Sequence, residues 1–300
     1  MILWSDSVSQ VEKLVTAEHV DRYESDGCVR VEGVFDAGVC RALIAAIDEA
    51  ARNFGTPAFS QIDTGARHQN PPSVHRGEGQ MQLRNFAQHV PLMREWLWHS
   101  CAAELVARLM RARHVRFWMD ATFVKEGGDP GSATPWHNDE CTFPFTGQMM
   151  PSFWVALTDV QADNAPLVTL RGSNRDPWRY HSPMSNAEAF ETEHIPWSHL
   201  ERRVARPDAP KDVWPCKAGD VLLIHPKTIH ASLPQQPTAT GRRIALTVRW
   251  LGDDVRWAPN SLTIRIPKLE ATGLMRPGEP PPDDLFPVIW PRDAQTGDLR

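Results

Sequence analysis

The sequence has few cysteines, and their spacing argues against cross-links. Five Cys residues are present, an odd number, and they are widely separated with no Cys-x-x-Cys pair. A small disulfide-rich fold or a structural zinc site would need closer or paired cysteines. We therefore expect reduced thiols and a cytoplasmic protein.

Long apolar runs and a surplus of positive charge are also missing. The N-terminus turns polar after Trp4, unlike the apolar core of a signal peptide, and no run approaches membrane-spanning length. The 32 basic and 37 acidic side chains give a net charge of -5. Without a basic excess, phosphate backbones gain little attraction. We therefore expect neither a membrane nor a nucleic-acid partner, and the oligomeric state stays open.

The 300 residues, 41% hydrophobic and 23% charged, suit a single domain spanning residues 1–300. Its N-terminal part, 20–112, carries two amphipathic helical patterns, one capped by Asp36 and one opened by Pro91. A polar loop at 54–80, rich in Gly, Pro, Ser and Asn, separates them. Such a loop is typical of lids and substrate loops.

After this part, short β-rich segments separated by turn signals replace the helical patterns. Without long helices between them, they predict a mainly β fold with flanking helices: a double-stranded β-helix, or jelly-roll/cupin-like barrel, over 115–257. A polar stretch at 176–215 reads as an insertion, and the Pro-rich tail 258–300 is expected to wrap the surface. The β-rich segments are 115–124, 152–157, 167–170, 221–224 and 243–250.

The histidines supply a candidate metal site. Of three His-x-Asp/Glu triplets, beginning at His19, His137 and His199, only the one ending at Asp139 lies between β-rich segments. Side chains two apart on a strand point to one side, so an imidazole and a carboxylate could share a metal. Two His and one carboxylate suit Fe(II) and leave positions open for a co-substrate and dioxygen.

The third ligand is either His225 or His230. His225 ends a strand, immediately before Pro226, whereas His230 begins a turn that leads into a polar loop, so we favour His230. Arg242 and Arg243 open the next strand with side chains on opposite faces. One of them could bind a co-substrate carboxylate inside the barrel. The alternative is that both are solvated at a strand edge.

Four motifs occur in an order that resembles one family. They are Thr-Pro-Trp-His-Asn-Asp at 134–139, the strand and Arg-Gly-Ser-Asn segment of 152–174, the strand at 218–230, and Gly-Arg-Arg-Ile-Ala-Leu-Thr-Val-Arg-Trp within 241–254. Together they resemble the phytanoyl-CoA dioxygenase family of Fe(II)/2-oxoglutarate-dependent oxygenases. The family usually has Gly at Ala165 and His at Asn174, which leaves the substrate open.

The resemblance implies Fe(II), 2-oxoglutarate and dioxygen as cofactor and co-substrates. It implies His137, Asp139 and His230 as iron ligands, and Arg243 as the partner of the 2-oxoglutarate carboxylate, with Arg242 as the alternative. Three further positions match the co-substrate pocket, although barrel core is an equal alternative for the last two: Ser232, Trp154 and Met119.

The expected reaction is hydroxylation of a small-molecule metabolite with release of succinate and CO2. Halogenation is disfavoured, because halogenating relatives have a small residue where Asp139 stands. Two alternatives remain: a cupin-type isomerase or hydrolase that uses a metal without 2-oxoglutarate, and a non-catalytic small-molecule-binding protein. Five residues are candidate substrate contacts, with packing as the alternative for each: Trp136, Asn138, Phe143, Phe145 and Arg84.

Overall fold

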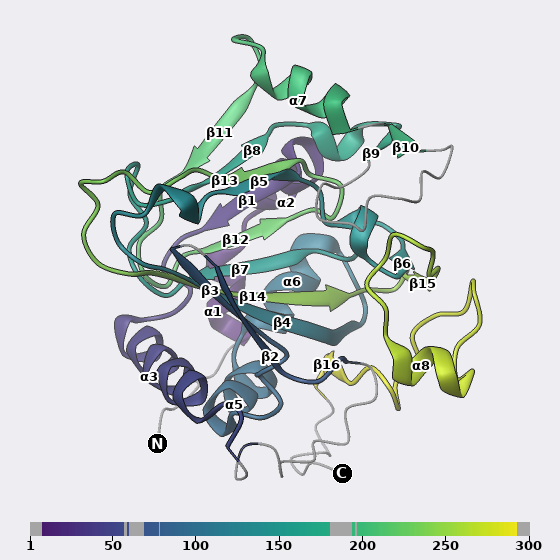
Figure 1. Cartoon of the computed structure of the whole chain (residues 1–300). Coiled ribbons are helices and arrows are strands. Elements are labelled where there is room, and N and C mark those ends of the chain that lie inside the picture. The colour runs from purple at the N-terminus through teal and green to yellow at the C-terminus, as the bar shows by residue number, and fades with distance from the viewer. Residues whose placement is uncertain are drawn as a thin grey trace.

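The computed structural model describes residues 8–56, 59, 69–77, 79–180, 194–195 and 197–292. Its centre is a pair of β-sheets, with helices beside both of them (Figure 1). The larger, eight-stranded sheet has the order β1-β12-β7-β14-β4-β3-β2, and β16 pairs with β4 beside this path. Its strands are β1 (Cys28–Val31), β12 (Val221–Ile224), β7 (Ser152–Ala156), β14 (Arg243–Leu251), β4 (Val115–Lys125), β3 (Gln80–Arg84), β2 (Ser73–Gly77) and β16 (Val288–Trp290).

The smaller sheet has the order β11-β8-β13-β5. Along the chain, β4, β5, β7 and β8 alternate between the two sheets, and so do β11, β12, β13 and β14. This alternation of antiparallel strands is the double-stranded β-helix predicted from the sequence. The small-sheet strands are β11 (Lys211–Trp214), β8 (Leu167–Leu170), β13 (His230–Ser232) and β5 (Thr134–His137).

Helices cover the outer face of the large sheet. Residues of α2, α3, α5 and α6 join one hydrophobic cluster with outward strand residues such as Phe153 and Val155. The intervening Trp154 and Ala156 belong to a second cluster, between the sheets. This period of two gives the large sheet an inner face that can line a site. The helices are α1 (Val8–Leu14), α2 (Ala17–Asp26), α3 (Ala37–Asn53), α5 (Pro91–His99), α6 (Ala102–Met110), α7 (Trp197–Ala205) and α8 (Pro267–Thr272).

Helix boundaries follow the capping residues. The Asp36 side chain accepts a hydrogen bond of 2.9 Å from the Val39 amide at the start of α3, as the sequence predicts. The helical pattern from Pro91 divides into α5 and α6, because Ser100 takes an extended backbone conformation (φ -78°, ψ 170°). The remaining elements are the strand pairs β6 (Phe145–Thr146) with β15 (Arg256–Trp257) and β9 (Arg179–Tyr180) with β10 (His194–Ile195), and short 3₁₀ turns at Pro130–Ser132, Glu140–Thr142 and Ser173–Arg175.

Three predicted segments contain strands that the sequence pattern did not indicate. The loop at 54–80 includes β2, whose Ser-Val-His-Arg-Gly sequence lacks apolar alternation because it is a partly exposed edge strand. The insertion at 176–215 ends in β11, an edge strand of the small sheet with exposed side chains. The tail from 258 contributes α8 and β16. Parts of all three segments lie outside the described residues.

No helix within the described ranges combines the length and the apolar character needed to cross a membrane.

Candidate metal centre

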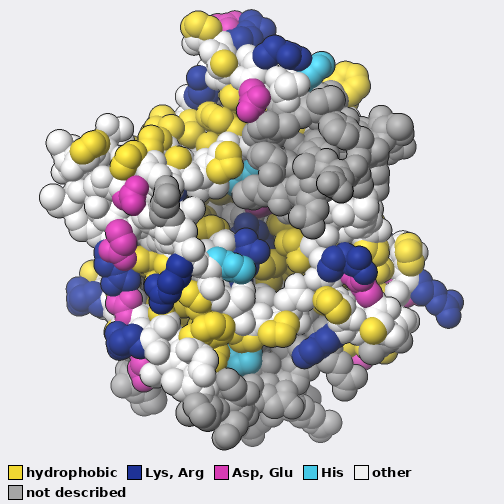
Figure 2. Space-filling model, in the orientation of Figure 1, with side chains coloured by type: hydrophobic (Ala, Val, Ile, Leu, Met, Phe, Trp, Pro, Cys, Tyr) yellow, Lys and Arg dark blue, Asp and Glu magenta, His cyan; other side chains and the backbone are white. Residues whose placement is uncertain are grey.

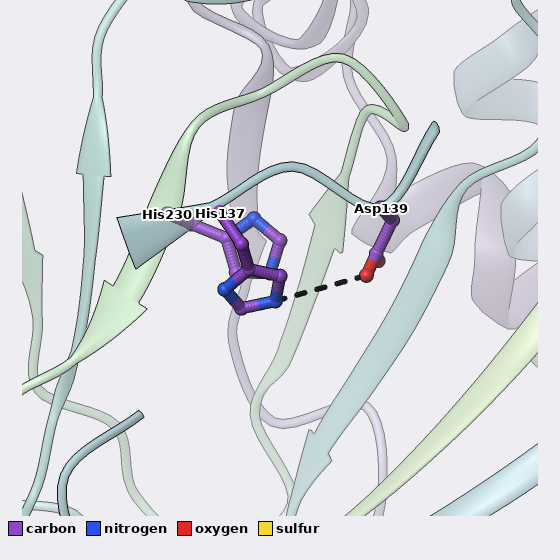
Figure 3. Close-up of side chains that lie close together, drawn as sticks. All are labelled: His137, Asp139 and His230. Carbon is purple, nitrogen blue, oxygen red and sulfur yellow. Dashed lines mark ion pairs between the residues drawn. The ribbon is translucent and has the colours of Figure 1, made fainter. Parts of the chain in front are cut away.

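His137, Asp139 and His230 meet between the two sheets (Figure 3). His137 ends β5 and lies directly opposite His230 on β13, with ring centroids 4.2 Å apart. Asp139 follows two residues later, and its Oδ1 lies 3.8 Å from Nε2 of His137. One ligand atom from each residue lies within 4.8 Å of the others, and all three residues are buried.

Strand alternation alone does not bring Asp139 to this point. The strand ends at His137, and Asp139 takes a helical backbone conformation (φ -79°, ψ -33°) before the Glu140–Thr142 turn. Its amide donates a 3.1 Å hydrogen bond to the carbonyl oxygen of Pro226, at the end of the β12 segment. The convergence of the side chains was expected from the sequence, but the expected reason, that both residues lie on one strand, was wrong.

Both imidazoles are oriented by backbone carbonyls. Nδ1 of His137 lies 2.8 Å from the oxygen of Pro135, and Nδ1 of His230 lies 2.9 Å from that of Thr228. A ring that donates from Nδ1 keeps the lone pair on Nε2 free for a metal. Burial, and next the nearby His230, lower the pKa of His137 to about 4, so this ring is neutral at pH 7.

The carboxylate is held in its charged form. Burial alone would raise the pKa of Asp139, but Arg249, His230 and His137 together hold it well below its usual range. The Ser152 hydroxyl donates to Oδ2, and Nη2 of Arg249 lies 3.4 Å from the carboxylate. Two imidazoles and one ionised carboxylate form a donor set that fits Fe(II).

The three candidate ligands line a cavity of about 220 Å³. Its walls come from the inner faces of β3, β4, β7 and β14 and from β5 and β13 of the small sheet. Figure 2 shows a hollow in this face of the molecule, with basic side chains inside it and hydrophobic side chains around it. The cavity has room for a small molecule beside the triad.

Two buried basic side chains lie next to each other in this cavity. Arg243 and Lys125 are direct partners in the β14–β4 ladder, and each is only 1% exposed. Arg243 donates to the carbonyl oxygen of Ala165 at 3.0 Å and lies over the Trp154 ring, 5.1 Å from its centroid. Burial lowers the pKa of Arg243 to about 10, which still leaves it charged at pH 7.

The ammonium group of Lys125 forms its hydrogen bonds with two hydroxyl groups. Its Nζ donates to Ser232 at 2.7 Å and to Thr134 at 3.3 Å. Burial, and next the charge of Arg243, lower the pKa of Lys125 to about 6. The guanidinium of Arg243 and the amino group of Lys125 thus lie side by side without an acidic partner among the described residues. This arrangement is expected of an anion-binding site.

The phytanoyl-CoA dioxygenase family model (PhyH) matches residues 23–244, which is more than half of the sequence. The chain belongs to the phytanoyl-CoA dioxygenase family. Comparison with curated protein sequences gave no match.

Solved structures agree with this family fold. The α-ketoglutarate-dependent carbocyclase SnoK from nogalamycin biosynthesis aligns with a TM-score of 0.67 and 22% identity, over 92% of this chain and 97% of its own. The epimerase SnoN from the same biosynthesis aligns at 0.64 and 23%, over 94% and 98%. EctD from S. alaskensis with bound Fe aligns at 0.58 and 17%, over 79% and 77%. At these identities the likeness concerns the fold.

Of the alternative residues for the third ligand and for the cation, His230 and Arg243 line the cavity, whereas His225 and Arg242 do not. His225 is buried beside Tyr23, with ring centroids 5.8 Å apart, and does not join the metal-binding group. Arg242 forms hydrogen bonds of 3.0 and 2.7 Å with both carboxylate oxygens of Asp48, away from the cavity-lining residues. Arg243 enters the cavity in its place.

The candidate pocket residues divide in the same way. Ser232, Trp154 and Met119 line the cavity, as do Arg84 and Phe143. The other three proposed substrate contacts do not line it, because they pack elsewhere. Trp136 packs against the cluster that contains Leu170 and Tyr180, Asn138 is buried in the turn after β5, and Phe145 packs between Trp118, Trp257 and Phe286.

Three polar residues of the site were not predicted from the sequence. Ser152 opens β7, Lys125 closes β4, and Arg249 lies six residues after Arg243 on β14. Residues separated by an even number of positions lie on one face of a strand, so Arg249 could have been predicted from the position of Arg243. Lys125 has the same even spacing from Met119, which was singled out.

Proposed function

We propose that this member of the phytanoyl-CoA dioxygenase family is an Fe(II)- and 2-oxoglutarate-dependent oxygenase that hydroxylates a small-molecule metabolite, releasing succinate and CO2. The observation that carries the proposal is the buried triad in one cavity with the adjacent cations Arg243 and Lys125. Structures with the same fold support it, since SnoN is described with Fe3+ and α-ketoglutarate, and HygX with nickel and 2-oxoglutarate.

His137, Asp139 and His230 would hold the iron. When bound, iron and 2-oxoglutarate supply the chemistry that reduces dioxygen and oxidises a C–H bond of the substrate. The chain's own part is to present two Nε2 atoms and one carboxylate at fixed positions. The carbonyl oxygens of Pro135 and Thr228 keep the rings oriented for this role.

The far carboxylate of 2-oxoglutarate would lie between Arg243, Lys125 and the Ser232 hydroxyl. A guanidinium can bind a carboxylate through two parallel hydrogen bonds, and the lysine adds a second charge-assisted bond. The Trp154 ring supports the guanidinium from one side. Met119 contributes apolar wall that helps exclude water from the reacting groups.

Hydroxylation is the outcome we assign, although similar structures include a carbocyclase and an epimerase. An epimerase must return a hydrogen atom to the opposite face of the substrate carbon, for which thiols and phenols are suitable donors. The cavity-lining residues that the structure describes include neither Cys nor Tyr. Oxygen insertion needs no such donor.

The test is succinate formation from 2-oxoglutarate with Fe(II) and dioxygen, measured against a panel of metabolites. The wild type should form succinate, and H137A should not. H199A is the matched control, because His199 begins another His-x-Glu triplet but is exposed on α7. A cupin-type isomerase or hydrolase would form no succinate, and a non-catalytic binding protein would consume no oxygen; either result rejects the proposal.

A further inference from the structure

The cavity holds a second pair of cations, on the side of the triad where Asp139 lies. We propose that Arg84 and Arg249 bind a carboxylate or phosphate group of the primary substrate, an inference that rests on the proposed function. Arg84 is on β3, Arg249 is on β14, and both line the cavity. They are therefore placed to select substrates by charge.

The sheet register brings the two guanidiniums onto the same face of the large sheet. In the ladders of β3, β4 and β14, Arg84 pairs with Ala121, and Ala121 pairs with Thr247. Arg249 is the next inward position after Thr247. The methyl side chain of Ala121 leaves the space above β4 open, so both long side chains can reach a common group there.

The guanidinium of Arg249 is not satisfied by the protein. Nη2 of Arg249 lies 3.4 Å from Asp139, but its Nε and Nη1 are buried with no acceptor among the described residues. Nη2 of Arg84 donates to the amide oxygen of Gln82 at 2.9 Å. Elsewhere the chain pairs arginines with carboxylates, as in Arg242 with Asp48. Unused buried donors of this kind call for an acceptor from outside the chain.

The charges of the cavity point to an anion. Its described lining contains three guanidiniums, at positions 84, 243 and 249, and one carboxylate, Asp139, while Lys125, with a pKa of about 6, is mainly neutral at pH 7 in the empty cavity. A divalent metal and the dianion 2-oxoglutarate add charges that cancel, so the cationic excess remains after both have bound. Burial, and next the charge of Arg249, lower the pKa of Arg84, so the two cations repel each other while no anion is present.

The C1 carboxylate of 2-oxoglutarate is the other source of such an anion. The far carboxylate of 2-oxoglutarate would bind Arg243 and Lys125. The positive charge of the metal ion would balance its C1 carboxylate. The pair formed by Arg84 and Arg249 is therefore left for the substrate. Arg249 also lies near Phe143, a candidate substrate contact, with its guanidinium carbon 5.8 Å from the ring centroid.

Inorganic sulfate is a suitable probe, since the substrate is unidentified. Its binding to the protein loaded with Fe(II) and 2-oxoglutarate would be measured anaerobically by calorimetry at constant ionic strength. The variants are R84Q and R84K, which leave the contact of Arg249 with Asp139 in place. R76Q is the matched control, because Arg76 is an exposed arginine on the adjacent strand β2. The affinity of each variant for 2-oxoglutarate is measured in parallel.

We expect saturable sulfate binding by the wild type and R76Q, a loss of about tenfold in affinity for R84Q, and partial retention for R84K. The 2-oxoglutarate affinity of R84Q should match that of the wild type. Absence of sulfate binding, or an equal affinity in R84Q, would overturn the inference. So would a parallel loss of 2-oxoglutarate affinity in R84Q, which would assign the pair to the co-substrate. If the wild type itself fails to bind 2-oxoglutarate, the proposed function fails instead.

Discussion

Lys125 and Arg243 face each other directly across β4 and β14, and both side chains enter the cavity that the metal-binding triad lines. Burial removes the water around both side chains, and the charge of Arg243 repels a charged Lys125, so the pKa of Lys125 falls to about 6 while the cavity is empty. A carboxylate between them would relieve both costs. The pair therefore favours a co-substrate with an anionic end, such as 2-oxoglutarate.

Replacing the lysine should weaken co-substrate binding. K125M removes one charge-assisted hydrogen bond to the far carboxylate, so the dissociation constant for 2-oxoglutarate should rise about tenfold or more. Anaerobic calorimetry with Fe(II) measures this directly. K217M, a change at an exposed lysine outside the cavity, should bind as the wild type does. An unchanged constant for K125M would remove Lys125 from the co-substrate site.

The same lysine should make 2-oxoglutarate binding depend on pH. Burial, and next Arg243, lower the pKa of Lys125 to about 6 in the empty cavity, and a bound carboxylate would raise it again. Below about pH 6 the ammonium is already present, whereas above it binding requires proton uptake. The apparent dissociation constant should therefore rise with pH, by up to about tenfold per unit. Ser232, Thr134 and Arg243 are the other described polar contacts or charges facing this group.

The measurement is the dissociation constant of the wild type and K125M between about pH 6 and about pH 8. The wild type should lose affinity with rising pH, and K125M should show a shallower slope. Calorimetry in buffers of different ionisation enthalpy should also detect proton uptake by the wild type only. Parallel slopes in the two proteins would contradict this account of Lys125.

Much of the barrel could be predicted because its central strands are β-rich segments between clear turn signals. Central strands such as β7 and β14 are buried on both faces, and their apolar runs are long enough to recognise. The edge strands β2 and β11 could not be recognised in this way, since their side chains are partly exposed and their pattern is mixed. Their pairing depends on the neighbouring strand, which the local sequence does not encode.

Mutation should show which of His225 and His230 is the third metal ligand. H230A should lose tight metal binding, because it removes one of three ligands. H225A should keep metal binding, since His225 packs against Tyr23 outside the triad. The Fe(II) content of each variant after anaerobic reconstitution gives the answer. Loss of iron from H225A with retention in H230A would reverse the assignment.

A buried carboxylate that takes no part in the reaction should make the stability of the protein depend on pH. Asp120, fully buried on β4, accepts hydrogen bonds of 3.0 Å from the amides of Phe86 and Ala87. Burial nevertheless raises the pKa of Asp120 to about 6. Because this value lies above the unfolded one, the group's stabilising contribution is complete below about pH 4 and is lost as pH rises to about 6.

D120N removes this titration. The free energy of unfolding of the wild type, minus that of D120N, should fall by up to about 3 kcal/mol between about pH 4 and about pH 7. Denaturant unfolding of the metal-free protein measures the difference. D21N is the control, because the Asp21 side chain is 74% exposed. A difference that stays constant with pH would show that Asp120 has an ordinary pKa.

The convergence of the three candidate ligands could be predicted because a His-x-Asp triplet and a distant histidine can be recognised in the sequence itself. The partners of these residues were harder to find. Arg249 and Ser152 act on Asp139 only through the packing of β7 and β14 against the turn after β5. Similarly, the choice between Arg242 and Arg243 depends on Asp48, a residue of a helix remote in sequence. Such contacts are set by the tertiary fold.

The most direct test of the central claim is anaerobic binding of 2-oxoglutarate to the protein with and without Fe(II). The wild type should bind one 2-oxoglutarate with Fe(II), giving the visible absorption of an iron chelate, and H137A and H230A should give none. H199A should behave as the wild type. Iron-independent binding, or an absorption band that survives in H137A, would contradict the claim that these histidines and Asp139 hold the iron beside Arg243.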